Sequence, residues 1–409
     1  MANPSGILTQ AAVRRPDEDS EYSDLATFGT NQLPLLTENL KSTPVFDKEE
    51  ANAGAAGVQD GEIVAWRVDG PMSYELWYES LEPLFLAGMG FECPTVYTGA
   101  HGTGSGGSPA PDVASPSDEA YFHVFELDEQ LHRSGWLSGE RAASTGLSTA
   151  PTYWDSSDQK VRSVDLGIYK TEPAAAVHGY HGMMVKKFTI RATLDRCTVD
   201  FEFIGRRHKQ DALLNYGSWA LPVSRARVVF PSLRFFCTAV GSTIGTEYAV
   251  KELTVVCDNG LEGEFVSGTD SEYTIEPIRT GTRKVTGQLK IARYDSSQWF
   301  TWRDNETDVQ MLFNFTSGQQ ISGSSKYYNM NVALPRVRVT EASYPIGGPG
   351  VIMGDISFEA WKPASEQAWL TSILGGISQV KLNEMLLTIW NKNPACYSRD
   401  RQASGVTLP

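Results

Sequence analysis

Three short patterns in the sequence contain residue types that could bind a ligand or react. Residues 102–107 read GTGSGG and formally match G-x-G-x-x-G, the glycine pattern that lets a backbone turn approach a pyrophosphate. This pattern binds dinucleotides only where a strand precedes it and a helix follows. Pro109, Pro111 and Pro116 follow it here, so no helix can start cleanly. We therefore interpret residues 102–107 as part of a flexible linker.

The second pattern is a histidine pair. His178 and His181 are three residues apart, which on a helix could place two imidazoles around one metal ion. Two glycines and β-forming neighbours oppose a helix here, and no third histidine or carboxylate lies at a useful short spacing. We expect both to be turn or strand-edge histidines without a metal. The remaining histidines are isolated in the sequence: His101, His123, His132 and His208.

The third pattern is acidic. Asp47, Glu49 and Glu50 surround Lys48 and could be read as paired carboxylates. General acid–base catalysis needs two groups whose surroundings push their pKa values apart, and no apolar stretch surrounds these. A solvated or partner-facing segment is the better interpretation. No G-x-S-x-G, H-E-x-x-H, P-loop or calcium-loop pattern occurs in the sequence, so we predict neither an enzyme nor a cofactor.

Composition narrows the class further. The 409 residues carry 49 acidic and 35 basic side chains, a net charge of −14, which disfavours a protein that holds nucleic acid through its phosphates. No apolar run reaches the length of about 18 residues that a membrane helix requires. The five cysteines are scattered without a C-x-x-C pair, so we expect buried thiols and neither a disulfide framework nor a zinc site.

The first half of the chain alternates long irregular stretches with short regular ones. Residues 33–62 form a long connection with an acidic middle, and 99–160 is a Gly/Ser/Pro-rich insertion with one plausible strand at 120–125. Between them, strands at 63–68 and 72–78 flank Asp-Gly-Pro, which predicts a hairpin. Ser80, Pro83 and a glycine at 88 or 90 predict a short helix.

The second half reads almost wholly as β structure. Val309, Met311, Phe313 and Phe315 alternate with mostly polar residues, the period of a half-buried antiparallel sheet. Strands are predicted at 163–170, 182–192, 198–206, 226–238, 250–257, 284–294, 308–316, 326–340 and 351–361. The segment around Trp369 suits a helical turn and 385–390 a last strand. The predicted fold is therefore mainly β, with one short helix and long loops.

The serial order of these elements resembles the tail tube proteins, or major tail proteins, of long-tailed bacteriophages. Three blocks carry the resemblance, each degenerate by itself. The first block contains Phe28-Gly29-Thr30, TENLK at 37–41, GEIV at 61–64 and the segment 72–90. The second contains Tyr180, Gly182 and Gly205 within residues 178–208. The third is the set of terminal strands with Leu334-Pro335 and Phe358-x-Ala360.

The resemblance implies a structural virion protein with an antiparallel β-sandwich or half-barrel that closes with other copies into a multi-subunit β-barrel. Stacked hexameric rings of this homo-oligomer would form the tail tube, which would pass double-stranded DNA during ejection without specific binding. A tape measure protein and a tail terminator are the implied partners, and assembly would take place in the bacterial host cytoplasm. Within the 33–62 segment we expect inter-ring contacts from Phe46, Asp47, Lys48, Glu49 and Glu50.

The same interpretation divides the chain into three parts. Residues 1–32 are an N-terminal arm, 33–98 and 161–409 the tube β domain, and 99–160 the insertion. Two alternatives remain open from the sequence: another phage structural β protein (tail terminator, distal tail or capsid decoration protein), and a carbohydrate-binding, adhesin-like β-sandwich. The second would need exposed Trp and Tyr side chains along one groove.

Overall fold

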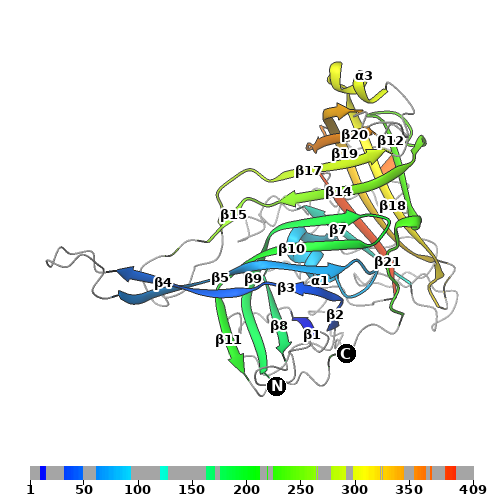
Figure 1. Ribbon diagram of the computed structural model, residues 1–409. Coiled ribbons are helices and arrows are strands. Elements are labelled where there is room, and N and C mark those ends of the chain that lie inside the picture. The colour runs from blue at the N-terminus through cyan, green and yellow to red at the C-terminus, as the bar shows by residue number, and fades with distance from the viewer. Residues whose placement is uncertain are drawn as a thin grey trace, which may run out of the picture.

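The protein is built from antiparallel β-strands and two short helices in the part of the chain that the structure describes (Figure 1). The computed structural model describes residues 10–14, 32–48, 61–93, 120–127, 163–170, 176–211, 219, 224–263, 265, 278–291, 298–322, 324, 326–344, 354–364, 369–370 and 383–392. Its helical elements are α1 (Glu82–Met89), α3 (Gln298–Asp304) and the 3₁₀ turn Phe230–Ser232. The strands are β1 (Gln10–Arg14), β2 (Gln32–Leu33), β3 (Leu35–Glu38), β4 (Lys41–Lys48), β5 (Gly61–Glu75), β6 (Gly90–Cys93), β7 (Tyr121–Leu127), β8 (Val164–Lys170), β9 (Ala176–Ala192), β10 (Cys197–Gly205), β11 (Arg207–Asp211), β12 (Leu233–Ala239), β13 (Glu247–Tyr248), β14 (Val250–Asp258), β15 (Leu261–Glu262), β16 (Ile278–Arg279), β17 (Lys284–Ile291), β18 (Asp308–Gln320), β19 (Tyr327–Ser343), β20 (Gly354–Ala360) and β21 (Leu386–Asn391).

Two long strands organise the sheet, because each pairs with different neighbours along its two halves. The first half of β9 pairs with β8 and β11, and its second half with β10 and β14. Strand β19 pairs with β18, and its two halves pair with β21 and β20. Strand β17 joins β14 to β20, so one ladder runs β5–β10–β9–β14–β17–β20–β19–β18–β12 and curls around the core. The mainly β, antiparallel half-barrel predicted from the sequence is confirmed.

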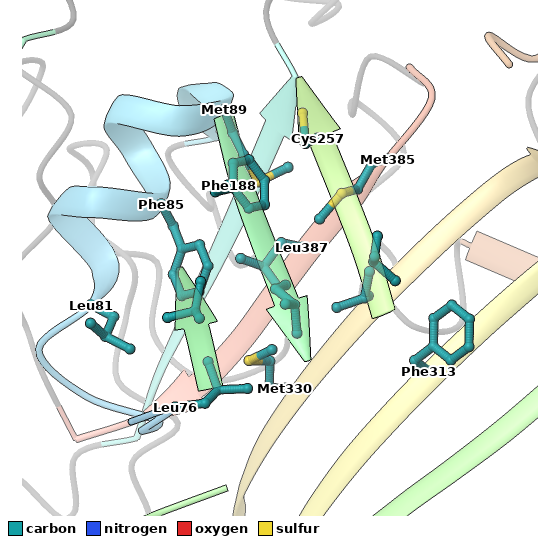
Figure 2. Close-up of a cluster of buried hydrophobic side chains, with 14 of the residues drawn as sticks. Leu76, Leu81, Phe85, Met89, Phe188, Cys257, Phe313, Met330, Met385 and Leu387 are labelled. Carbon is teal, nitrogen blue, oxygen red and sulfur yellow. The ribbon is translucent and has the colours of Figure 1, made fainter. Parts of the chain in front are cut away.

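Helix α1 packs beside the strands, and its Phe85 and Met89 lie with Phe188 of β9 in the buried cluster (Figure 2). All eight of its residues are buried, and Phe85 contacts Phe125, Phe188 and Phe201 at ring-centroid distances of 5.7–6.3 Å. A fully buried phenylalanine contributes about 1.5–3 kcal/mol through burial alone, so this cluster dominates the local packing. The helix ends at Gly90, whose φ of 92° is the left-handed cap that the glycine pattern predicted. Ser80 is not its cap: the N-cap is Leu81, without a side-chain hydrogen bond.

The hairpin predicted across Asp69-Gly70-Pro71 is wrong. Residues 61–75 form the single strand β5, which pairs continuously with β10 across Gly70 and Pro71. The connection predicted for 33–62 is also partly wrong, because 41–48 form strand β4 paired with β5. The acidic middle of that segment suggested a connection. Within the described chain β4 pairs only with β5, and such an edge position tolerates Pro44, which has no backbone N–H.

Most predicted strands of the second half are present, with shifted ends. The segment 226–238 is shorter than predicted, because Phe230-Pro231-Ser232 make a 3₁₀ turn and the strand begins only at Leu233. Helix α3 was not predicted, since its aromatic residues favour strands; Trp299 and Trp302 face the core from one side of it. The predicted strand at 385–390 is β21.

Two segments assigned outside the β domain contribute strands to the sheet. Strand β1, from the predicted N-terminal arm, pairs with β8 and buries Ala11 and Ala12. Strand β7, from the predicted insertion 99–160, pairs with β6 and β21. The remainder of that insertion lies outside the described residues, so the division of the chain into domains stays a prediction.

Candidate assembly site

The β4–β5 hairpin projects from the body of the sheet (Figure 1). Residues 68–75 of β5 are hydrogen-bonded to β10, and 72–74 also pair with β3. Residues 61–67 pair, within the described chain, with β4 alone. The outer part of the hairpin is therefore a two-stranded ribbon, which is marginally stable by itself and leaves the backbone groups along its borders open to pairing.

This ribbon carries a concentration of exposed apolar side chains. Val45, Phe46, Ile63 and Val64 are 37%, 50%, 49% and 46% exposed. They are half of the eight large exposed hydrophobic side chains in the described chain, although the ribbon is a small part of it. Phe46 and Ile63 are direct cross-strand partners, next to a bulge in the ladder. Such a cluster on a thin projection is typical of a surface that is covered by another protein.

The residues predicted for inter-ring contact fall at the end of β4. Phe46 is the most exposed of the four apolar residues. Asp47 and Lys48 pair with Glu62 and Gly61 along the backbone, but their side chains are not described. Glu49 and Glu50 lie outside the described residues. Sequence reasoning missed Ile63 and Val64 as surface residues, because their β-branched pattern looked like a core strand.

The root of the hairpin is held tightly to the body. Gly70 has φ +145°, and a Cβ placed there would lie 2.3 Å from the carbonyl oxygen of Asn39, so only glycine fits. Leu40, the last residue before β4, closes the root: its N–H donates to Glu38 Oε1 at 2.9 Å, and its carbonyl accepts from the Tyr180 hydroxyl at 3.3 Å. Lys170 Nζ lies 2.7 Å from Glu38 Oε2.

A histidine pair adjoins this root. His178 Nδ1 and His208 Nε2 are 3.1 Å apart with nearly parallel rings, and Tyr180 stacks on His208 at 4.7 Å. His208, isolated in the sequence, is thus paired, and His178 lies within β9 between β8 and β11 rather than at an edge. Burial, reinforced by nearby Lys170, lowers the pKa of His178 below its usual 6.5, and burial with the neighbouring imidazole lowers the pKa of His208 to about 4.

His181 points to the opposite side of β9 and lies 3.4 Å from Asp165. His123 is buried on β7, where its Nε2 lies 3.1 Å from Asn391 Oδ1. His101 and His132 lie outside the described residues, as does the glycine pattern at 102–107. Among the residues that the structure describes, no group of three or more His, Cys, Asp or Glu side chains is arranged to hold a metal ion.

The described cysteines behave as the sequence predicted. Cys197, Cys237 and Cys257 are buried free thiols. Burial raises the pKa of Cys257 to about 12, so it stays a neutral, unreactive thiol. The side chain of Cys93 is not described, and Cys396 lies outside the described residues.

Neither of two surface grooves in the described part of the chain is lined by Trp or Tyr. One, with a volume of about 800 Å³, runs beside the hairpin root between Lys41, Lys170, Lys186 and Glu202. The other carries Glu252, Glu341 and Asp355 on the polar face of the sheet. Aromatic stacking platforms for sugars are therefore not provided by these grooves.

The sequence model of one protein family, described as phage tail tube protein, matches residues 22–360 of this sequence. The chain belongs to this family. Its role is thus structural, as a component of a virion tail, where copies of a tail tube protein assemble into the tube. This membership confirms the resemblance seen in the sequence and favours the tube over the adhesin alternative.

The chain is similar to the SPP1 tail tube, a hybrid structure from solid-state NMR and cryo-EM, with 14% identity over 37% of this chain and 87% of that one. The TM-score of this match is 0.24. No curated protein shows significant sequence similarity to the chain. No helix in the described part is long and apolar enough to cross a membrane.

Proposed function

We propose that copies of this chain close edge to edge into six-membered rings, that the rings stack into the tail tube, and that the genome passes through the lumen during ejection. The observation that carries the proposal is the β4–β5 hairpin, whose apolar side chains are 37–50% exposed and whose outer backbone edge is unpaired within the described chain. Packing of the ribbon on another copy would bury these side chains and pair this edge.

The hairpin is the proposed contact between rings. Phe46 and Ile63 form its apolar centre, and Asp47, Lys48, Glu49 and Glu50 continue the chain beyond it. A projection of this kind can reach past the boundary of its own ring, whereas the curled sheet supplies the wall. The acidic end would then meet a polar surface of the neighbouring ring.

The expected dimensions suit a DNA conduit. About four strands from each of six subunits would give a barrel of about 24 strands, with a backbone diameter of roughly 48 Å. Side chains of about 5 Å on each wall leave a lumen of roughly 40 Å, wider than a duplex of roughly 20 Å. With a net charge of −14 on the chain, a net-negative wall would let the polyanion slide without phosphate contacts. A measured positive lumen would contradict this part.

The partners follow from the proposed place in the virion. A tape measure protein would occupy the lumen before ejection, and a tail terminator would end the tube. Assembly would take place in the host cytoplasm. No catalytic step and no cofactor is part of the proposal.

The decisive experiment replaces the apolar centre of the hairpin. The double variant Phe46→Ser, Ile63→Ser should fold normally but form no tubes in negative-stain electron microscopy. The matched control is Leu194→Ser, Val229→Ser, which removes two other side chains exposed by 75% and 48%. The control should still assemble.

Two results would count against the contact. Normal tubes from the hairpin variant would show that Phe46 and Ile63 do not join the rings. Equal failure of the control would show that the hairpin has no special role. Deletion of residues 44–58 gives a coarser version of the same test, with soluble subunits that do not polymerise as the expected result.

A further inference from the structure

The two imidazoles beside the hairpin root form a contact that depends on protonation. At a separation of 3.1 Å, one of the facing nitrogens, His178 Nδ1 or His208 Nε2, donates its hydrogen and the other accepts it. Accepting requires a neutral ring. When both rings carry a second proton, two N–H donors and two positive charges face each other, and the contact becomes repulsive.

This contact is connected to the hairpin by a short chain of interactions. His208 stacks on Tyr180 at 4.7 Å, and the Tyr180 hydroxyl donates to the carbonyl of Leu40, the last residue before β4. The Lys170–Glu38 ion pair runs parallel to this link, and Glu38 also accepts from the Leu40 N–H. Any movement of the His208 ring therefore disturbs the interactions that fix the start of β4.

We propose that the His178–His208 pair is an acid-sensitive latch on the root of the β4–β5 hairpin: at neutral pH it fixes the hairpin for assembly, and acidification releases it. The latch rests on the proposed assembly role of the hairpin, and it adds a means of regulating that role. The groove of about 800 Å³ beside Lys170 and Leu40 gives water access to this part of the root.

The sign of the effect follows from the surrounding groups. Burial lowers the pKa of both histidines, and the positive charge of Lys170 on β8 lowers both further. His181 acts in the same direction on His208, whereas Glu38 on β3 raises the pKa of His178. Tyr180 has a raised pKa and stays neutral.

In the closed root the pKa of His208 is about 4, and in a released root it returns toward 6.5. The released form therefore binds protons first. The preference for the closed root is complete above about pH 6.5 and declines as the pH falls toward 4.

The test measures the hairpin in unassembled, full-length subunits. Amide hydrogen exchange of residues 41–48 and 61–67, corrected for the intrinsic pH dependence of exchange, should lose protection with a midpoint between pH 6.5 and 4. Amides of β10 and β14 should stay protected over the same range. Simultaneous loss of protection in those strands would mean global unfolding and would overturn the latch.

Two matched variants separate charge from structure. Lys170→Gln and Glu38→Gln break the same ion pair, so a purely structural role predicts shifts in the same direction. The latch predicts opposite shifts of about 0.5–1 pH unit. The midpoint should move downward for Lys170→Gln, because the closed-root pKa values rise toward those of the released root and acid drives release less strongly, and upward for Glu38→Gln, because the closed-root pKa of His178 falls further. Equal shifts in one direction, or none, would contradict it.

The double variant His178→Gln, His208→Gln should abolish the midpoint altogether, because no titrating ring remains in the pair. An unchanged midpoint would show that a group other than these two histidines takes up the proton, which would contradict the latch. Tube formation by electron microscopy is scored separately. A pH-independent hairpin in subunits that still need Phe46 and Ile63 to assemble would refute the latch alone. An acid-released hairpin that tubes do not need would refute the stacking contact alone.

Discussion

The cluster around helix α1 and the outer part of the β4–β5 hairpin differ in how far their apolar side chains are buried. Around α1, Phe85 is surrounded by aromatic rings from three strands and has no exposed surface. In the hairpin, Phe46 has one cross-strand partner and is half exposed. Both residues are phenylalanines in regular structure, so the difference lies in what covers them.

The apolar side chains around α1 are buried when the subunit folds, whereas those of the hairpin would be buried only when subunits assemble. The α1 cluster is finished inside one subunit, and its packing sets subunit stability. The hairpin is finished only against another copy, and its side chains should be nearly neutral for the stability of the subunit. Substitutions in the two regions should therefore split cleanly between folding and polymerisation.

The largest effect is expected at Phe85. Phe85→Ala should lower the free energy of unfolding by about 3–5 kcal/mol, because the lost burial and the remaining cavity add. Urea unfolding of the subunit measures it. Phe85→Leu, which keeps most of the volume, should cost less than half as much. A loss under about 1 kcal/mol for Phe85→Ala would mean that the helix is not the centre of the core.

The next effect is expected at Gly70, where the hairpin joins the body. Gly70→Ala should cost about 1–3 kcal/mol, since the backbone would be strained and the new Cβ would collide with the Asn39 carbonyl. Gly318→Ala, in a strand with open space at the same position, is the control and should be close to neutral. Equal costs at the two glycines would show that the root is not closed as described.

The smallest effect on subunit stability is expected in the hairpin itself. Phe46→Ser, Ile63→Ser should change the free energy of unfolding by less than about 1 kcal/mol, the range of exposed substitutions, while it abolishes tubes. A loss as large as that of Phe85→Ala would show that the hairpin side chains are packed within the subunit, and the contrast between the regions would fail.

Much of the body was predictable from the sequence because its signals are local. The alternation of Val309, Met311 and Phe313 gave a strand, and Pro83 with Gly90 gave the helix and its end. The hairpin was harder, since the acidic middle of 33–62 resembled a connection and Asp69-Gly70-Pro71 a turn, and only the pairing of β5 with β4 and β10 decides both.

The histidine pair could not be predicted at all. His178 and His208 are 30 residues apart, and they meet because β11 pairs with the first half of β9 in one register. A shift of one residue would turn His208 to the other face of the sheet. Sequence spacing contains no information on that register, so His208 looked isolated and His178 was grouped with His181 instead.

A cryo-EM reconstruction of the assembled protein tests the account most directly, because it shows what covers the hairpin. We expect a helical tube in which Phe46 and Ile63 are buried against a subunit of the adjacent ring and the outer edge of β4 is covered. A tube in which both side chains remain in solvent, with the rings joined through other surfaces, would contradict the account.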